Sequence, residues 1–157
     1  DALMAHRIID RKLDGTGLGI AVVAARFNSY MADQMLEITL ERLSALGVAD
    51  ENVIVVRTAG SFELPLTARR LAERGDVDAV ICIGVVIRGD TDHYEHIART
   101  AADGIARAGD DSGKPVIFGV LTTENTDQAV TRIPQASDYA DTAVEMAGTL
   151  RQIHDLR

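Results

Sequence analysis

The chain has 157 residues and a formal net charge of −8, with 46% hydrophobic and 25% charged residues. These values are typical of a soluble globular protein that can bury a hydrophobic core, and the negative charge argues against general nucleic-acid binding, which needs Lys and Arg to neutralise phosphates. No apolar run approaches the roughly 20 residues of a membrane-spanning helix, and the first ten residues contain no secretory apolar region. We therefore expect a cytoplasmic protein with neither a nucleic-acid nor a membrane partner.

In chain order, apolar strands alternate with helically spaced segments. Residues 18–25 form a continuous apolar run, typical of a strand covered on both faces. The pattern then predicts a helix over 29–46 that ends at Gly47. The same alternation gives strand 53–56, helix 66–74 opened by Pro65, strand 79–84, helix 92–108, strand 115–121, and helices 125–131 and 137–153. Pro134 disfavours helical geometry at Ile133 and predicts a break there.

This order predicts an α/β fold with helices on both faces of a mainly parallel four-stranded sheet. Residues 5–12 are the candidate for a short edge strand within an N-terminal arm of residues 1–11. The sequence contains no linker-like composition shift, internal repeat or low-complexity segment, so we expect one domain over residues 1–157.

The single cysteine, Cys82, lies in the apolar run of a predicted strand. An intrachain disulfide is excluded, and a reducing compartment fits. Because burial raises the pKa of a thiol, Cys82 is not expected to act as a nucleophile.

Polar or aromatic residues directly follow several predicted strands, where ligands of open α/β sheets collect. These segments are 26–28, 60–63, 84–93 and 121–123. In the third, the turn at Gly89, Asp90 and Thr91 opens a helix whose free N–H groups and dipole favour an anion, and Asp90 or Thr91 is expected to cap that helix.

His93 follows this turn, at the mouth of the candidate anion site. Its imidazole suits proton transfer near neutral pH, although the simpler interpretation is a solvated first-turn histidine. The spacing between His93 and His96 is three residues rather than four, and no third ligand is evident, so no metal site is predicted. Phe27 suits stacking on a planar ring, whereas an aromatic residue that closes a strand is more often part of the core.

Four segments together resemble the lumazine synthase family, in the family's order and with compatible spacings. They are residues 25–28 (ARFN), 60–65 (GSFELP), 84–94 (GVVIRGDTDHY) and 115–124 (PVIFGVLTTE). The resemblance implies a flavodoxin-like, three-layer α/β/α subunit that forms homopentamers, which in some members assemble into icosahedral capsids.

The resemblance also implies a transferase of riboflavin biosynthesis. Such an enzyme condenses 5-amino-6-(D-ribitylamino)uracil with 3,4-dihydroxy-2-butanone 4-phosphate to 6,7-dimethyl-8-ribityllumazine, and it releases phosphate and water. The implied partners are these small molecules and further copies of the chain, and neither a metal nor an organic cofactor is implied.

Residue roles carry over by position. His93 would be the acid/base and Arg132, from a neighbouring subunit, would clamp the phosphate. Phe27 would stack on the pyrimidine. The other substrate contacts implied are Asn28, Gly60, Ser61, Phe62, Glu63, Val86, Ile87, the phosphate nest Gly89, Asp90 and Thr91, Phe118 from the neighbouring subunit, and Asp138.

The sequence departs from the family after Arg132. Residues 133–137 are shorter than the family's usual loop and lack its lysine. Two alternatives therefore stand beside lumazine synthase: an archaeal-type riboflavin synthase, which is a paralogue of similar fold, and a non-catalytic shell or flavin- or lumazine-binding protein.

Overall fold

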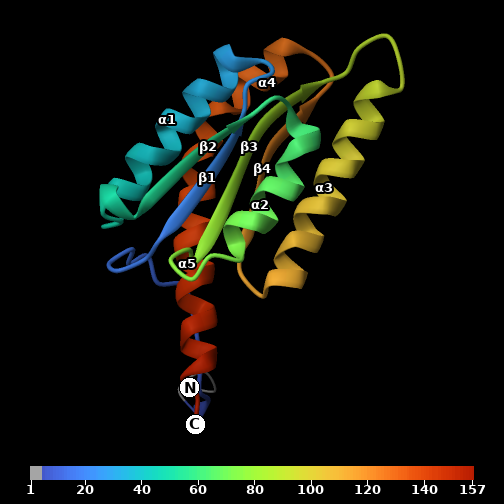
Figure 1. The fold of residues 1–157 in the computed structure, drawn as a ribbon. Helices are drawn as coiled ribbons and strands as arrows, with labels where there is room; N and C mark the ends of the chain where they lie inside the picture. The colour runs from blue at the N-terminus through green and yellow to red at the C-terminus, as the bar shows by residue number, and fades with distance from the viewer. Residues whose placement is uncertain (1–4) are drawn as a thin grey trace.

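The computed structural model describes residues 5–157, in which strands and helices alternate along the chain (Figure 1). The strands are β1 (Ile20–Ala25), β2 (Val53–Thr58), β3 (Ala79–Ile87) and β4 (Val116–Thr123). The α-helices are α1 (Ser29–Ala45), α2 (Leu64–Ala72), α3 (His93–Ser112), α4 (Thr126–Arg132) and α5 (Ala136–His154). Short 3-10 helices lie between them, namely η2 (Asp50–Asn52), η3 (Ser61–Glu63) and η4 (Ile133–Gln135).

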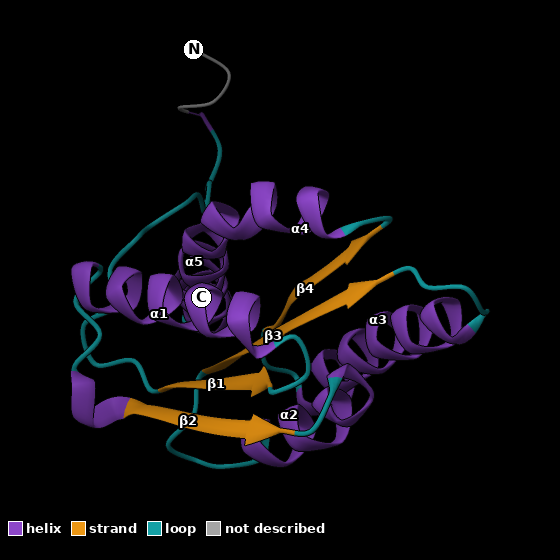
Figure 2. Cartoon of the chain, turned by 90° about the horizontal axis from the view of Figure 1, so that it is seen from above, coloured by secondary structure: helices purple, strands orange, loops and turns teal. Residues whose placement is uncertain are grey.

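The strands form a four-stranded parallel sheet in the order β2-β1-β3-β4. Ile20 of β1 is in register with Val53 of β2 on one side and with Ala79 of β3 on the other. Figure 2 shows the layers: α1, α4 and α5 lie on one face of the sheet, and α2 and α3 lie on the other. The predicted α/β architecture is therefore confirmed, and its strand order is that of flavodoxin-like folds.

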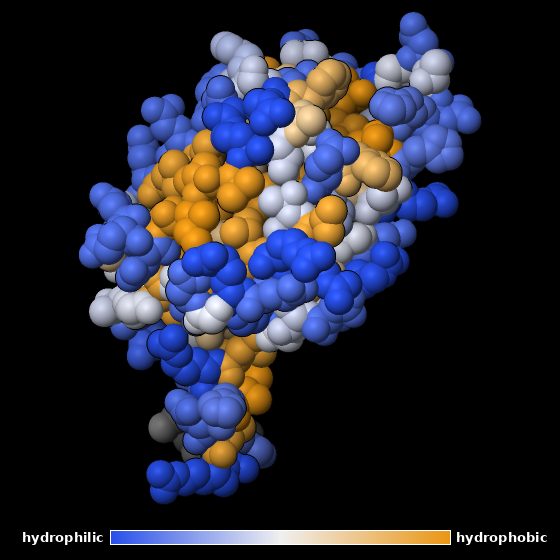
Figure 3. Space-filling model, viewed as in Figure 1, coloured by the Kyte–Doolittle hydropathy of each residue, from blue (hydrophilic) through white to orange (hydrophobic). Residues whose placement is uncertain are grey.

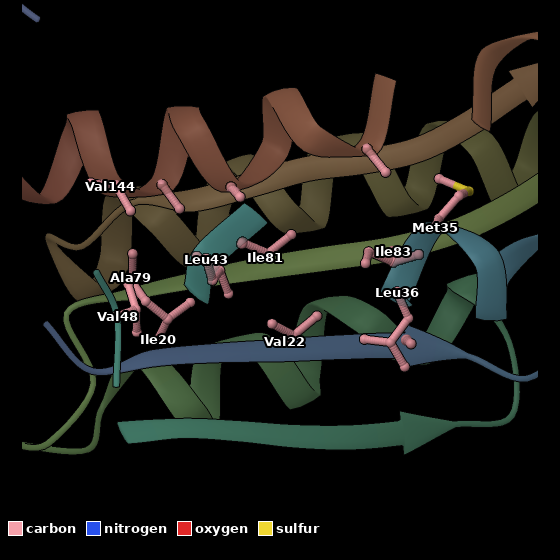
Figure 4. Packing of buried hydrophobic residues seen from close by; sticks show 14 of the residues in the cluster. Ile20, Val22, Met35, Leu36, Leu43, Val48, Ala79, Ile81, Ile83 and Val144 are labelled. Atoms are coloured by element: carbon pink, nitrogen blue, oxygen red, sulfur yellow. The ribbon is translucent and has the colours of Figure 1, made fainter. Parts of the chain in front are cut away.

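Both faces of the central strands are buried, which explains their continuous apolar runs. Ile20 and Val22 of β1 pack with Ile81 of β3 against α1 and α5 (Figure 4). Ala21 and Val23 alternate with them and pack in the second core, under α2 and α3. Strands of this kind have no solvent-facing side, so polar residues appear only where a strand ends.

Helix ends agree with their sequence signals in two places. The chain leaves α1 through Gly47, whose φ of 95° lies in the left-handed region that favours glycine. Pro65 lies in the first turn of α2, where its missing N–H removes no helical hydrogen bond. Pro65 also contacts α3 closely, because a Cβ at Gly104 would lie 2.6 Å from its Cγ.

The predicted edge strand is wrong, because residues 5–12 contain no strand. Arg11 instead forms ion pairs with Asp141 at 3.2 Å and Glu145 at 3.0 Å, both on α5. Arg11 therefore ties this segment to a helix through carboxylates, and the segment does not pair with a strand. Residues 1–4 of the proposed arm lie outside the described residues.

Two other boundaries differ from the predictions. Helix α3 continues to Ser112 and ends at Gly113, whose φ is 68°; its last turn contains no apolar residue that could mark it in the sequence. A break does occur at Pro134, but Ile133 itself is helical (φ −51°, ψ −43°). The chain tightens there into η4 because Pro134 has no N–H to donate. Among the helices of residues 5–157, none combines the length and the apolar character needed to cross a membrane.

Candidate active site

A pocket opens at the carboxyl ends of β1, β2 and β3, beside the start of α3. Its cavity volume is about 570 Å³. The neighbouring strands β1 and β3 are where the winding of the sheet changes direction, and ligands of doubly wound folds bind at such points. Ten of the residues predicted from the sequence line it: Phe27, Gly60, Ser61, Phe62, Glu63, Val86, Ile87, Gly89, Thr91 and His93.

Two aromatic rings are exposed at this pocket. The side chain of Phe27, after β1, is 70% exposed, and that of Phe62, in η3, is 54% exposed. The loops that carry them are joined by backbone hydrogen bonds, from Arg26 N–H to the Thr58 carbonyl at 2.7 Å and from Phe27 N–H to the Ala59 carbonyl at 3.0 Å. Exposed rings beside a cavity are suited to stacking on a planar ligand.

The segment after β2 is built from reciprocal backbone and side-chain contacts. The Gly60 N–H donates to Glu63 Oε1 at 2.9 Å, and the Glu63 N–H donates to the Gly60 carbonyl at 3.3 Å. Ser61 is buried against β3, since a Cβ at Gly84 would lie 2.4 Å from its Oγ. The Glu63 carboxylate is therefore held at the pocket by the start of its own helix.

The turn before α3 is exposed, and so is His93. Thr91 Oγ1 accepts a hydrogen bond from the His93 N–H at 3.3 Å, whereas Asp92 occupies the N-cap position without a side-chain bond. Of the two expected capping side chains, Thr91 thus contacts the helix, and no capping bond from Asp90 is found among the described residues. His93 and Thr91 share one pocket wall with Gly89.

The guanidinium of Arg88 is paired with two carboxylates beside this turn. It forms ion pairs with Glu124 at 2.9 Å and Glu95 at 3.3 Å, and it lies 4.7 Å from the centroid of the Tyr94 ring. Glu124, and then Glu95, raise the pKa of Arg88 above its usual value. Its charge is neutralised locally, so Arg88 is not available as a free cation for the pocket.

Four lining residues were given no role from the sequence, namely Ala59, Val85, Tyr94 and Ile97, although Val85 lies within the predicted segment 84–93. Tyr94 and Ile97 lie on α3, and Ile97 is four residues after His93 and so on the same helix face. That spacing could have identified Ile97 from the sequence. Ala59 and Val85 are strand-end residues with no chemical signal of their own.

Five predicted residues do not line the pocket: Asn28, Asp90, Phe118, Arg132 and Asp138. Asn28 lies behind it, and its side-chain Nδ2 donates to the Val85 carbonyl at 2.9 Å. Asp90 is exposed in the turn next to Gly89, and Asp138 is exposed in the first turn of α5.

Phe118 and Arg132 are the two residues that the resemblance assigned to a neighbouring subunit. Phe118 is 41% exposed on β4, which is an edge of the sheet. Arg132 lies in a separate polar hollow along α4, and its guanidinium makes no hydrogen bond or ion pair within residues 5–157. Within one chain, both side chains are away from the pocket.

Cys82 is confirmed as a buried strand residue. Desolvation raises the pKa of its thiol to about 12, and it does not reach the pocket. A thiol of this kind is protonated at neutral pH and unreactive.

The fold and the pocket define a class: a doubly wound α/β protein whose ligand site, with aromatic rings and a helix start, lies at the switch point of a parallel sheet. A family model described as 6,7-dimethyl-8-ribityllumazine synthase matches residues 17–151, which is most of the chain. The protein belongs to this family of transferase-type enzymes of riboflavin biosynthesis.

Proposed function

We propose that the protein condenses 5-amino-6-(D-ribitylamino)uracil with 3,4-dihydroxy-2-butanone 4-phosphate to 6,7-dimethyl-8-ribityllumazine, releasing phosphate and water. One observation carries the proposal: Phe27, which follows β1, lines a single pocket together with Gly89, Thr91 and His93 at the start of α3. This arrangement supports a ring-stacking surface, a proton-transfer group and an anion site within reach of one another. Such a reaction depends mainly on alignment of two reactants, and few catalytic side chains are needed for that.

The pyrimidine would stack on Phe27, with main-chain groups of Val86 and Ile87 at the end of β3 available to its polar edge. The Glu63 carboxylate and the backbone around Ser61 would receive the ribityl chain. Glu63 suits this role because Gly60 occupies only one of its carboxylate oxygens, Oε1. His93 would move protons during imine formation and phosphate loss, which are steps that an imidazole serves near neutral pH.

The phosphate argues for a second copy of the chain at the site. Gly89 and Thr91 offer backbone groups at the start of α3, but no lysine or arginine is among the residues that line this pocket in the described chain. Arg88 is paired with two carboxylates, whereas the guanidinium of Arg132 is unpaired and faces another hollow. A departing phosphate needs cationic stabilisation, and Arg132 of a neighbouring subunit would supply it.

Exposed apolar surface supports such an assembly. Figure 3 shows hydrophobic surface over β2 and along the projecting end of α5. Val55 of the edge strand β2 is 41% exposed, and Ile153 of α5 is 51% exposed. Apolar surface on a sheet edge or a helix face commonly marks an interface. We propose that the chain forms a homopentamer. Light scattering on the purified protein would show whether the pentamers assemble further into an icosahedral capsid.

One observation favours a second function, a non-catalytic shell or flavin- or lumazine-binding protein. The segment after Arg132 continues through the single turn η4 into α5, with no longer loop and no lysine. If turnover requires the lysine that the family usually has in this loop, the pocket of this protein would bind a ribityl-bearing ring but would not catalyse the formation of the lumazine.

The test combines turnover with complementation between subunits. Purified protein with both substrates, and without added metal, should generate the fluorescence of the lumazine. His93→Ala and Arg132→Ala should each reduce the rate by about tenfold or more, since positioned acids, bases and charge clamps contribute at least that much. His96→Ala and Arg107→Ala, at exposed positions of α3 outside the pocket, are the matched controls.

Assemblies that contain both variants distinguish an active site shared between two subunits from an active site formed within one chain. Unfolding and refolding the two inactive variants together at equal amounts should restore about a quarter of the sites, because a head-to-tail ring pairs each pocket with one neighbour. No recovery in mixed assemblies would place both residues in one subunit. If both single variants stay within twofold of the wild-type rate, the roles of His93 and Arg132 are wrong; binding of the lumazine without turnover would favour the second function.

A further inference from the structure

Asn28 has an unusual backbone conformation directly after the pocket residue Phe27. Its φ of 59° and ψ of 42° place it in the left-handed region, where it is the only residue other than glycine with positive φ in residues 5–157. Asn enters this region more readily than most residues, and such conformations persist where surrounding contacts enforce them. Asn28 therefore sits at a point where the chain must turn sharply from β1 into α1.

The side chain of Asn28 makes the enforcing contact. Its Nδ2 donates to the carbonyl of Val85 at 2.9 Å, a bond from the end of β1 to the end of β3 that spans 57 residues of sequence. The Asn28 carbonyl accepts from the N–H groups of Met31 and Ala32, so the same residue also begins α1. The amide nitrogen is thus bonded within the protein, and Asn28 does not line the pocket.

Packing does not hold the neighbouring ring of Phe27. Phe27 is 70% exposed, so few side chains restrict its direction. Its own N–H is bound to the Ala59 carbonyl at 3.0 Å, which fixes the backbone before the ring. The Asn28 amide fixes the backbone after it. Fixing the backbone on both sides sets the direction of the Phe27 Cα–Cβ bond toward the pocket, which reduces the entropy lost when the ring meets a planar ligand.

We propose that Asn28 is a positioning residue: by tying its left-handed backbone to the Val85 carbonyl, it holds Phe27 in the orientation in which the ring stacks on substrate. The stacking part of this proposal rests on the proposed function. The anchoring part does not, and it is measured without ligand.

Two variants separate the amide from the backbone conformation. Asn28→Asp keeps the shape and the tolerance for positive φ, but it presents an oxygen instead of an N–H to the Val85 carbonyl. Asn28→Gly keeps the left-handed backbone and removes the side chain. Asn52→Asp, at an exposed position in η2, is the matched control. Thermal unfolding establishes which variants are folded before comparison.

Hydrogen exchange followed by mass spectrometry measures the anchoring on the intact protein. In both Asn28 variants, exchange of residues 26–32 should accelerate by about tenfold, the effect of losing one net hydrogen bond from local opening. The buried strand β3 should exchange as in wild type, and so should every segment of Asn52→Asp. Unchanged exchange at residues 26–32 in both Asn28 variants would overturn the proposal.

A double-mutant cycle measures how the anchoring acts on ligand. The probe is 6,7-dimethyl-8-ribityllumazine, titrated by its fluorescence. Asn28→Asp should raise its Kd by about tenfold in the wild-type background, the equivalent of one hydrogen bond, and by less than about twofold when Phe27→Ala is also present, because residues that act as a unit are not additive. Equal effects in both backgrounds would mean direct contact with ligand and would overturn positioning. If the wild-type protein binds no probe, the proposed function fails, and hydrogen exchange alone decides whether Asn28 holds Phe27.

Discussion

Glu63 Oε1 lies 2.9 Å from the backbone nitrogen of Gly60, three residues earlier, and accepts its hydrogen bond. Glu63→Ala removes this acceptor at the start of the helix and should lower the free energy of unfolding by about 1 kcal/mol, which is typical of a lost N-terminal cap. Glu63→Gln retains an acceptor oxygen and should stay close to wild type in urea unfolding. Equal destabilisation by the two substitutions would show that the contact contributes nothing and that charge matters instead.

Ser61 and Gly84 form the second close relationship beneath the pocket. A Cβ at Gly84 would lie 2.4 Å from Ser61 Oγ and 3.5 Å from Ser61 Cβ. Gly84→Ala should therefore destabilise the protein by about 1–3 kcal/mol through overpacking. Adding Ser61→Ala removes the clashing oxygen and leaves an ordinary contact, so the double variant should recover most of that loss. Urea unfolding of the two single variants and the double variant checks this; additive losses in the double variant would contradict it.

The sequence predicted the fold well where both faces of a strand are buried, because every residue of such a strand must be apolar. β1 and β3 are examples, and their continuous apolar runs indicate buried strands. The prediction of an edge strand in residues 5–12 was wrong because this segment is held by a contact that is distant in the sequence. The partner of Arg11 is Asp141, 130 residues later, and no local pattern indicates an ion pair of that separation.

The pocket followed from a topological rule, since ligands gather where parallel strands end. The rule examines the loops after strands, so it found Phe27 and His93 but missed Tyr94 and Ile97, which lie one step further along α3. The family resemblance assigned Asn28 to the substrate. Only the fold shows that the Asn28 amide is used by Val85.

Cys82 should make stability depend on alkaline pH. Burial raises the pKa of its thiol from 9.0 to about 12. Between these two values the unfolded chain has lost the thiol proton while the folded protein keeps it. The free energy of unfolding therefore falls as pH rises above 9, at a slope of up to about 1.4 kcal/mol per pH unit, and this contribution is absent below pH 9.

Comparison with Cys82→Ala isolates this effect, because all other titrating groups are shared. The difference in unfolding free energy between wild type and Cys82→Ala, measured in urea at pH 8 and pH 10.5, should change by about 1–2 kcal/mol to the disadvantage of wild type. A difference that is the same at both pH values would show that the thiol is accessible to water. Disulfide-exchange reagents at pH 8 should likewise react with Cys82 only in urea.

Asp141 joins the N-terminal segment, α1 and α5 through two arginines. Its Oδ1 lies 2.7 Å from Arg42 Nε and its Oδ2 lies 3.2 Å from Arg11 Nη2, while only 15% of the Asp141 side chain is exposed. Asp141→Ala leaves Arg42 without its partner and should lower the free energy of unfolding by about 1.5–3 kcal/mol, the range for hydrogen bonds to charged groups. Arg11→Ala removes an exposed side chain and should cost less than about 1 kcal/mol.

Limited digestion with trypsin tests the contact between Asp141 and the N-terminal segment. Loss of Asp141 leaves Arg11 with only its ion pair to Glu145, so the N-terminal segment is held less firmly and cleavage at Lys12 should be faster in Asp141→Ala than in wild type. Asp103→Ala, at an exposed position of α3, should change neither cleavage nor stability. High salt should weaken the Arg11 contact more than the Arg42 contact, because Arg11 is 53% exposed and Arg42 38%. If Arg11→Ala and Asp141→Ala prove equally destabilising, the half-buried pair with Arg42 does not dominate, and the N-terminal segment is held chiefly by Arg11.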